Sequence, residues 1–268
     1  NNFFPILRLL LPHLDKERQT YGMKETNLGK YFVELLSISP ESEDGRRLLH
    51  WRRPTGGHEL EAGDFGNAAY MSLRNRCGGK ARLSVKHMND CLDALNATAD
   101  RKQKVRILKW LLRRSTAREM KWFVRIVVKD LKIGVSERTV LTTFHPDALD
   151  LFQATSNLRK VAVELHDPRV RLKSQAHAIA LFQPIKPMLA ARRNPDQVCA
   201  AMKNAAFIIE TKFDGERLQV HKEGTTIRLF SRNSNEVTAI YGDKLTPVLL
   251  ECITADTCIL DGELLVWD

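Results

Sequence analysis

The first two-thirds of the chain carries apolar residues at helical spacing. They recur three or four positions apart over residues 28–36 and again over residues 84–97. Such spacing gathers apolar side chains on one face, so we predict a helix over each segment, with Ser84 as the N-cap of the second. Residues 6–11 are heavily apolar and predict a short helix, which Pro12 is expected to end.

Residues 101–140 predict two further helices with a basic surface. This stretch holds thirteen Lys or Arg against only Glu119, Asp130 and Glu137 on the acidic side. A charge run is usually a solvated helix face, but the positive residues around 129–134 favour a surface that faces phosphates. Gly134 is expected to end a helix and to expose backbone N–H groups to a phosphate.

The pattern changes in the last third of the chain. After residue 204 the apolar period shifts toward two, which is typical of strands. The predicted strands cover residues 206–212, 217–221, 225–231 and 257–267, with a hairpin turn at 222–224. A Gly- and Pro-rich loop is predicted earlier, over residues 53–66. We therefore expect an α+β chain: an all-α helical domain over residues 1–180, and the beginning of a sheet-based domain over residues 181–268.

The composition favours a polyanionic partner. Forty-two Lys and Arg against 32 Asp and Glu give a net charge of +10, which suits nucleic acid or an anionic surface. The five cysteines are odd in number and lack CxxC spacing, so neither a zinc site nor a disulfide framework is predicted. No apolar run approaches the length of a membrane span. The chain begins without methionine, so we expect it to be cut from something longer.

The segment around Lys212 carries the candidate chemistry. Lys212 ends a predicted strand, Gly215 makes a turn, and Arg217 follows five positions after the lysine. A lysine is a nucleophile only when neutral, so the site is expected to lower its pKa by burial or by neighbouring positive charge. Taken alone, a Lys-x-Asp-Gly hairpin is more often a charged β-turn. Arg232 at the end of the next strand, and the acids of 261–263 inside an apolar strand, make the site hypothesis stronger.

Three motifs resemble those of a known enzyme family. The motifs are Lys212-Phe213-Asp214-Gly215-Glu216-Arg217, Ser231-Arg232-Asn233 and Asp261-Gly262-Glu263. In this order and spacing they are similar to the first three nucleotidyltransferase motifs of ATP-dependent DNA ligases. The resemblance implies an all-α helical DNA-binding domain followed by the N-terminal part of a mixed α/β, ATP-grasp-like nucleotidyltransferase domain.

Further segments extend the resemblance over essentially the whole chain. Lys186-Pro187-Met188-Leu189-Ala190 is similar to the start of the ligase catalytic domain, and residues 129–136 resemble a signature of the helical DNA-binding domain. Finer features are similar to the DNA ligase IV group, which acts in end joining. They are Tyr21-Gly22-Met23-Lys24-Glu25-Thr26, Gly63-Asp64-Phe65, Phe144-His145-Pro146-Asp147-Ala148 and Leu165-His166-Asp167-Pro168.

The resemblance implies a role for each motif residue. In such ligases the motif lysine attacks the α-phosphate of ATP and expels pyrophosphate. The AMP then passes to a DNA 5′-phosphate, and a 3′-hydroxyl seals the break. Carried over, Lys212 is the nucleophile and Arg217 holds the ribose. The remaining expected contacts are Glu210, Thr211 and Phe213 with adenine, Arg232 with the α-phosphate or the DNA 5′-phosphate, and Glu263 with ribose or Mg²⁺.

The resemblance also implies partners and a setting. ATP and Mg²⁺ are the implied cofactors, nicked or broken DNA duplex is the implied partner through its phosphate backbone, and the nucleus is the implied location. The process is double-strand break repair by non-homologous end joining, with a scaffold partner bound through BRCT repeats that the chain lacks. The later nucleotidyltransferase motifs are also missing after residue 268. We therefore expect this piece to show little or no self-adenylylation.

Two alternatives remain open from the residues. RNA ligases and capping guanylyltransferases share Lys-x-Asp-Gly, although a long basic helical domain directly upstream favours a DNA ligase. The chain could also act as a non-catalytic DNA- or protein-binding module. Loss of self-adenylylation on replacing Lys212 separates an enzyme from such a module.

Overall fold

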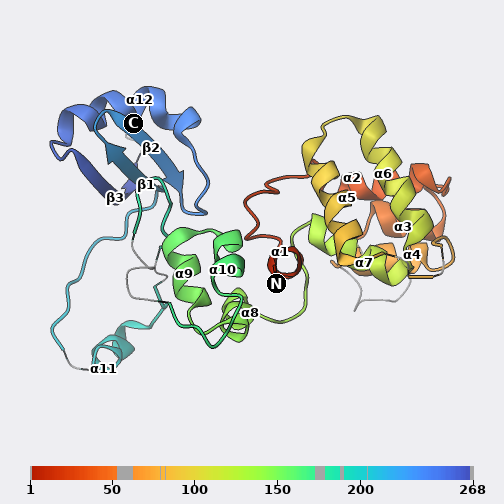
Figure 1. Cartoon of the computed structure of the whole chain (residues 1–268), viewed down its shortest axis with the longest axis horizontal. Helices are drawn as coiled ribbons and strands as arrows, with labels where there is room; N and C mark the ends of the chain where they lie inside the picture. Colours follow the sequence, from red (N-terminus) through yellow and green to blue (C-terminus); the bar gives the residue numbers. More distant parts are fainter. Residues whose placement is uncertain are drawn as a thin grey trace. The chain divides into compact units, whose positions relative to one another are not determined.

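The chain folds into two compact units. The computed structural model describes residues 2–52, 63–78, 80–81, 83–172, 179–187, 190–203 and 205–265. Asn1–Pro146 and Asn157–Val170 form one unit, here the helical unit, while Asp147–Ser156 and Arg171–Asp268 form the other, here the sheet unit. Figure 1 shows the helices and strands of both units, coloured from the N-terminus to the C-terminus. The predicted boundary at residue 180, between a DNA-binding domain and a nucleotidyltransferase domain, stays a prediction.

The helical unit confirms the helices that the apolar spacing predicts. Its helices are α1 (Phe4–Leu10), α2 (Glu25–Leu35), α3 (Glu43–Leu49), α4 (Phe65–Leu73), α5 (Val85–Ala97), α6 (Arg101–Arg114), α7 (Ala117–Val127), α8 (Glu137–Phe144) and α10 (Leu158–Glu164). The predicted segments 6–11, 28–36 and 84–97 correspond to α1, α2 and α5, and the two helices expected within 101–140 are α6 and α7. The apolar spacing did not single out α3, α4, α8 and α10.

Side-chain caps fix where several helices start. The Ser84 hydroxyl accepts from the His87 amide and the His87 ring accepts from the Ser84 amide, so the predicted N-cap of α5 is confirmed as a capping box. The Asp64 carboxylate accepts from the amides of Gly66 and Asn67 and so starts α4. The loop predicted over residues 53–66 therefore ends earlier than expected, and its residues 53–62 lie outside the described part of the chain.

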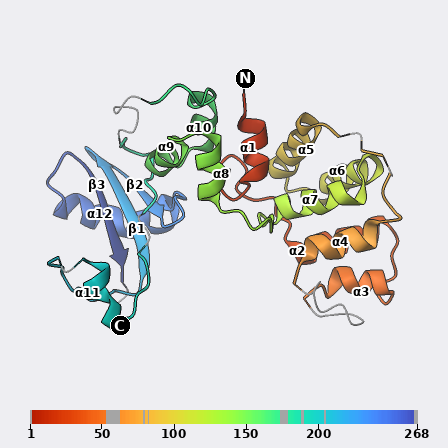
Figure 2. The same cartoon turned by 90° about the horizontal axis from the view of Figure 1, so that it is seen from below.

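Helices α4 and α7 form the centre of the helical core. They lie side by side in both views of the unit (Figure 2) and share one cluster of buried residues. Each helix turns an apolar stripe to the other, and the stripes hold Phe65, Ala69 and Leu73 on α4 and Met120, Phe123 and Val127 on α7. Each fully buried large side chain of this kind stabilises the fold by about 1.5–3 kcal/mol.

The sheet unit is built on three antiparallel strands. Its elements are α9 (Ala148–Thr155), the short η3 (Pro195–Gln197) and α11 (Val198–Ala201), β1 (Glu216–Glu223), β2 (Thr226–Ser231), α12 (Thr238–Cys252) and β3 (Thr257–Leu264). The strand order is β2-β1-β3. Alternate residues of β1 point to opposite faces. Leu218 and Val220 pack against α12 through Tyr241 and Leu245. The other face therefore carries Arg217, Gln219 and His221.

Three of the four predicted strands form, with shifted ends. The strand predicted over 257–267 ends at Leu264, and residues 266–268 lie outside the described part. The hairpin turn falls at residues 224–225 because Glu223 still pairs with Thr226. The acids of 261–263 do not interrupt β3 as expected, because both find partners within the sheet unit.

Two predictions of local structure are wrong. Residues 205–214 form no strand: Ile208 and Ile209 are 86% and 87% exposed, and no described segment pairs with them. A strand needs a hydrogen-bonded neighbour, which the pattern of a single segment does not guarantee. Gly134 does not end a helix either. Helix α7 ends at Val127, and Gly134, with φ of 68°, lies in the loop before α8.

Candidate functional site

The three ligase-like motifs converge on one end of the sheet. Arg217 pairs in register with Glu263 across β1 and β3, so both side chains point to the face opposite α12. Ser231, the last residue of β2, pairs with Leu218. Arg232 therefore follows at the same end of the sheet. Antiparallel pairing thus gathers motif residues that are far apart in the sequence.

The charged side chains at this end are held by specific hydrogen bonds. The Arg217 guanidinium donates from Nε to Oδ1 of Asp261 at 2.9 Å and from Nη2 to Oδ2 of the same carboxylate. This hydrogen bond raises the pKa of Arg217 above its usual value. Glu263 accepts from the Gly215 amide at 3.1 Å, which ties the turn before β1 to β3. The end of the sheet is therefore preorganised before any ligand binds.

A shallow cavity of about 320 Å³ lies beside these groups. Its lining is Lys212, Phe213, Arg217, Asp261, Gly262 and Glu263. The Lys212 ammonium donates to the Phe213 carbonyl oxygen at 3.3 Å and lies 3.7 Å from the Asp214 carboxylate. Its side chain is 84% exposed. The burial expected around Lys212 is thus not found, because residues 205–214 are exposed coil.

Four of the predicted site residues meet at the cavity and three do not. Lys212, Phe213, Arg217 and Glu263 line it. Glu210 and Thr211 lie in the exposed coil, and Arg232 is exposed in the turn after β2 without lining the cavity. Of the residues expected to contact adenine, only Phe213 therefore lines the cavity, and Arg232, expected at the α-phosphate, does not.

Gly215 allows the turn to approach β3 closely. A Cβ atom at this position would lie 2.3 Å from the Leu264 carbonyl oxygen and 2.8 Å from Leu265 Cδ2. No real Cβ atom tolerates such a contact with backbone. The glycine of the first motif is thus required by the packing of the turn, and this packing places Lys212 within reach of Arg217.

One carboxylate of the cavity suits a divalent cation. Among the described residues, no three His, Cys, Asp or Glu side chains are grouped so that they could hold a metal ion. Magnesium that arrives with phosphate oxygens needs only one or two protein carboxylates. Asp261 is neutralised by Arg217, whereas Glu263 keeps an oxygen free of the Gly215 hydrogen bond. Glu263 therefore fits the role of the single carboxylate ligand.

The same face of the sheet carries two residues that sequence reasoning missed. Gln219 and His221 are 8% and 0% exposed, and they hydrogen-bond to the backbone of Phe182 and Ile185. In the sequence they are polar positions of an alternating strand, which is the usual pattern of a solvated face. Asp261 was seen as part of a motif, but its pairing with Arg217 was not predicted.

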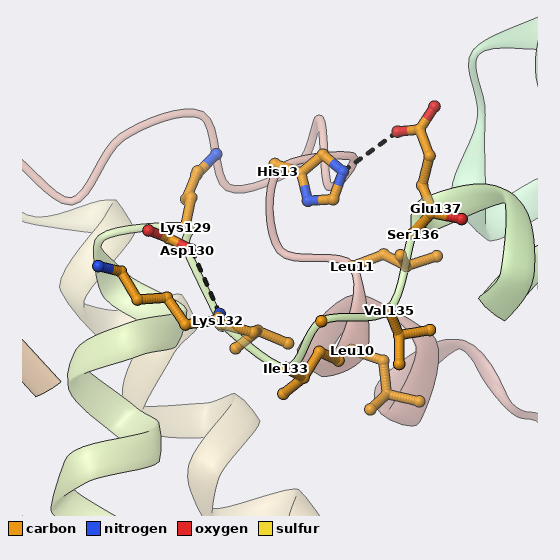
Figure 3. Close-up of a pocket in the computed structure, with 12 residues that line it drawn as sticks. Leu10, Leu11, His13, Lys129, Asp130, Lys132, Ile133, Val135, Ser136 and Glu137 are labelled. Atoms are coloured by element: carbon orange, nitrogen blue, oxygen red, sulfur yellow. Dashed lines mark hydrogen bonds and ion pairs between the residues drawn. The ribbon is translucent and has the colours of Figure 1, made fainter. Parts of the chain in front are cut away.

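A second candidate site lies in the helical unit, at the loop of residues 129–136. Figure 3 shows this loop around a cavity of about 510 Å³, with His13 hydrogen-bonded to Glu137 at 3.2 Å on one side. Lys132 donates to the Gly63 carbonyl oxygen at 2.8 Å and its own amide donates to Asp130.

Three backbone donors of this loop remain available. In the part of the chain that the structure describes, the amides of Ile133, Gly134 and Val135 donate to no protein acceptor. These neighbouring amides are hydrogen-bond donors suited to an anion, and Lys132 adds a positive charge on the same loop. The predicted phosphate-facing surface thus has a physical basis in the loop, although no helix ends at Gly134.

A helical unit and a small antiparallel sheet that gathers the three motifs at one end fit the beginning of an adenylation domain, and comparison with known proteins shows the family. The chain belongs to the ATP-dependent DNA ligase family: residues 1–145 match the family described as DNA ligase N terminus, and residues 187–268 match the ATP dependent DNA ligase domain. None of the described helices is long and apolar enough to cross a membrane.

Its relatives include several proteins named DNA ligase 4. The chain is 46% identical over 303 residues to DNA ligase 4 of Dictyostelium discoideum, and the match covers 100% of this chain and 28% of that protein. It is 42% identical to DNA ligase 4 of Homo sapiens, covering 100% of this chain and 30% of the relative. The chain therefore spans less than a third of the length of these relatives.

Proposed function

We propose that this chain is part of a nuclear DNA ligase that uses ATP to seal double-strand breaks by non-homologous end joining. The observation that carries the proposal is the grouping of Lys212, Arg217 and Glu263 around one cavity at the end of the sheet. The names of the relatives support the end-joining role. A scaffold partner bound through BRCT repeats belongs to the same proposal and concerns the longer protein.

The first chemical step falls to Lys212. Its neutral Nζ attacks the α-phosphorus of ATP, a nitrogen–phosphorus bond forms, and the bond to pyrophosphate breaks while the amine proton passes to solvent. Arg217 binds the ribose, and Arg232 stabilises charge on the α-phosphate. Mg²⁺, when bound near Glu263, supplies further positive charge to the phosphate oxygens. A DNA 5′-phosphate oxygen then attacks the AMP phosphorus, and the bond to Lys212 breaks. Finally the 3′-hydroxyl attacks the 5′-phosphate, forms the phosphodiester bond and releases AMP.

Adenine recognition requires the segment of residues 205–214 to change its surroundings. We assign Glu210, Thr211 and Phe213 to adenine contacts. The same segment exposes Ile208 and Ile209 almost completely, together with much of Phe207 and Phe213. A run of exposed apolar side chains is unfavourable in water and favours burial against more protein. In the longer protein this burial would bring Lys212 into a more enclosed site.

The chain binds DNA through the phosphate backbone of the duplex. The loop of residues 129–136 offers Lys132 and three amides that have no acceptor in the described part of the chain. Helix α6 adds exposed basic side chains such as Lys109 and Arg113. Such contacts neutralise phosphates without reading bases. Binding is therefore expected to weaken steeply with salt and to be independent of sequence.

The isolated chain is expected to behave differently from the longer protein. Its Lys212 is exposed and the cavity is shallow, so bound ATP would keep most of its solvent contacts. We propose that the 268-residue piece binds DNA while labelling itself with AMP weakly or not at all. Membership of a DNA ligase family argues against an RNA ligase or a capping enzyme.

The test is self-adenylylation with α-labelled ATP and Mg²⁺. The protein extended to the length of its relatives is compared with its Lys212→Ala and Lys212→Arg variants, the second of which keeps the positive charge. Label on the unmodified protein alone supports Lys212 as the nucleophile. If the folded protein carries no label, the chain is a DNA- or partner-binding module and not an enzyme. Strong labelling of the isolated 268-residue chain would refute the expectation for the piece.

A further inference from the structure

Residues 182–185 lie against the sheet face that bears the candidate nucleotide site. The Phe182 amide donates to His221 Nδ1 at 2.9 Å, and the Ile185 amide donates to the side-chain oxygen of Gln219 at 2.9 Å. The Gln219 side-chain nitrogen donates back to the Ile185 carbonyl oxygen at 3.4 Å. This side chain thus pairs with Ile185 as a strand neighbour would, although residues 182–185 form no strand.

The buried side chains of Gln219 and His221 form a closed hydrogen-bond network with the backbone of Phe182 and Ile185. His221 Nε2 and the Gln219 side-chain oxygen are 2.8 Å apart, so the ring donates from Nε2 and accepts at Nδ1. Both roles are filled only by the neutral ring. A second proton on Nδ1 would face the Phe182 N–H, donor against donor. Burial lowers the pKa of His221, which also favours the neutral ring.

On β3 the acid nearest to His221 is Asp261, one pair further along the same face, and its carboxylate is bonded to Arg217. The register partners of His221 are Arg228 on β2 and Ile259 on β3, and its ring contacts are with Phe182 and Phe230. The Arg228 guanidinium lies over the Phe182 ring, 5.0 Å from its centre. A positive charge on His221 would therefore meet the cation of Arg228, while the nearby carboxylate of Asp261 is already paired with Arg217.

The network is close to the candidate site along one strand. Gln219 and His221 follow Arg217 by two and four positions on β1, so all three point to the same face. At the rise of a strand, Gln219 lies about 7 Å from Arg217. Gln219 is also the register partner of Asp261, whose carboxylate binds Arg217. Residues 182–185 thus cover the part of the face next to the cavity.

We propose that Gln219 and His221 are positioning residues, which hold residues 182–185 on the sheet face next to the cavity and so shape the approach of the nucleotide to it. The proposal rests on the proposed ligase function for its link to ATP. Neither residue touches the reacting atoms. Both act through the segment that they hold, and they are therefore expected to change the apparent affinity for ATP more than the rate of the chemical step.

The first arm of the test measures the network directly in the 268-residue chain. Hydrogen exchange of peptides that contain Phe182 and Ile185 is compared among the unmodified chain, Gln219→Ala, His221→Phe and His221→Asn. Phenylalanine fills the space of the ring without an acceptor, whereas the asparagine oxygen can replace Nδ1. Faster exchange in Gln219→Ala and His221→Phe, with partial protection restored in His221→Asn, is expected. Equal exchange in all four chains overturns the proposal.

The second arm measures self-adenylylation in the protein extended to the length of its relatives. Gln219→Ala and His221→Phe are expected to raise the KM for ATP about tenfold with little change in kcat. His221→Asn is expected to recover part of that loss. For the unmodified protein, the KM for ATP should also rise as the pH falls below the usual histidine range, since protonation breaks the network. His221→Asn should lack this additional rise.

The outcomes separate this proposal from the proposed function. An unmodified protein that is never labelled refutes the ligase function and with it the ATP-positioning role, while the exchange data still decide whether the network holds residues 182–185. A labelled protein whose variants exchange faster but keep the original KM overturns the positioning role alone. If His221→Phe does not fold, Gln219→Ala and His221→Asn carry the same comparison.

Discussion

Arg217 and Asp261 form a two-point pair across neighbouring strands, with Nε donating to Oδ1 at 2.9 Å and Nη2 donating to the second oxygen. The side chains of both residues are about one-third exposed, so the pair stands at the edge of the cavity and not beneath it. Asp261 fixes the plane of the guanidinium. Arg217 therefore presents its remaining N–H groups to a ligand in a defined direction, which a flexible cation would not do.

Replacing Arg217 with Lys should weaken ATP use although the positive charge remains. Lysine has no planar fork, so it cannot bind Asp261 at two points and hold a ribose at the same time. We expect kcat/KM for self-adenylylation to fall about tenfold to a hundredfold in the longer protein. Initial rates of labelling over a range of ATP concentrations measure it. Arg193→Lys, at an exposed position of the sheet unit, is the control, and an equal effect of both changes would count against the assignment.

Gly215→Ala should disable the site without unfolding the helical unit. The added Cβ would meet the Leu264 carbonyl oxygen at 2.3 Å, so the turn that carries Lys212 must move. Displacements of about 1 Å cost up to about a hundredfold in rate, and a loss of that order is expected in self-adenylylation. Gly242→Ala on α12, outside the cavity lining, is the control, because a Cβ there would meet only side-chain atoms, at 3.2 Å and beyond. Similar activity of the two variants would show that the close approach does not matter.

The elements that are held by local signals could be predicted from the sequence. The capping of α5 by Ser84 and the apolar spacing of α6 and α7 depend on residues a few positions apart, so the pattern alone locates them. Helix α12 was missed because it contains Pro247 and only one of its residues, Gly242, is buried. Its apolar residues meet the sheet through partly buried contacts, which leave a weak periodic signal.

The parts of the site that depend on strand pairing could not be predicted. Arg217 and Asp261 are 44 positions apart, and only the register of β1 with β3 brings them together. The exposed coil of residues 205–214 shows the reverse case, in which a strand-like pattern lacks a partner. Gln219 alternates with apolar residues like any solvated strand position, and its burial becomes visible only when residues 182–185 are placed on the sheet.

Asp64 should stabilise the helical unit through two roles at once. Its carboxylate caps α4 and also binds Arg125, whose side chain is 8% exposed. Asp64→Ala removes the cap and leaves a buried cation without its partner, so we expect a loss of about 3 kcal/mol. Asp64→Asn keeps a cap acceptor and should cost less. Urea unfolding followed by tryptophan fluorescence reports mainly this unit, because three of the four tryptophans, Trp51, Trp110 and Trp122, lie in it.

The control for Asp64 is Asp90→Ala, which removes an exposed pair with Lys86 and should cost within about 0.5 kcal/mol. The acid dependence gives a second check. Burial opposes the charge of Asp64, but the hydrogen bond and charge of Arg125 lower its pKa overall. The stability difference from Asp64→Asn should therefore be complete above the ordinary Asp pKa of about 3.9 and disappear as the pH falls through the lower folded pKa. A difference that persists in acid would contradict the ion-pair role.

Lys132→Ala should reduce the dependence of DNA binding on salt. Its ammonium belongs to the exposed loop of residues 129–136 and donates to the Gly63 carbonyl oxygen. If it contacts one phosphate, the slope of log K against log salt should become shallower by about 0.9. Titrations of the 268-residue chain with a nicked duplex at several salt concentrations measure the slope. Lys132→Arg should keep it, since the charge is retained.

Lys86→Ala is the matched control for this slope, because the Lys86 ammonium is already paired with Asp90 at 2.6 Å on α5. The slope separates a lost phosphate contact from a distorted loop. Lys132 also donates to the Gly63 carbonyl oxygen, and loss of that hydrogen bond would weaken binding without removing a released counterion. Weaker binding at an unchanged slope would therefore assign Lys132 to the loop's structure and leave the phosphate contact to the backbone amides. A scrambled duplex should bind equally, because these groups meet no base edge.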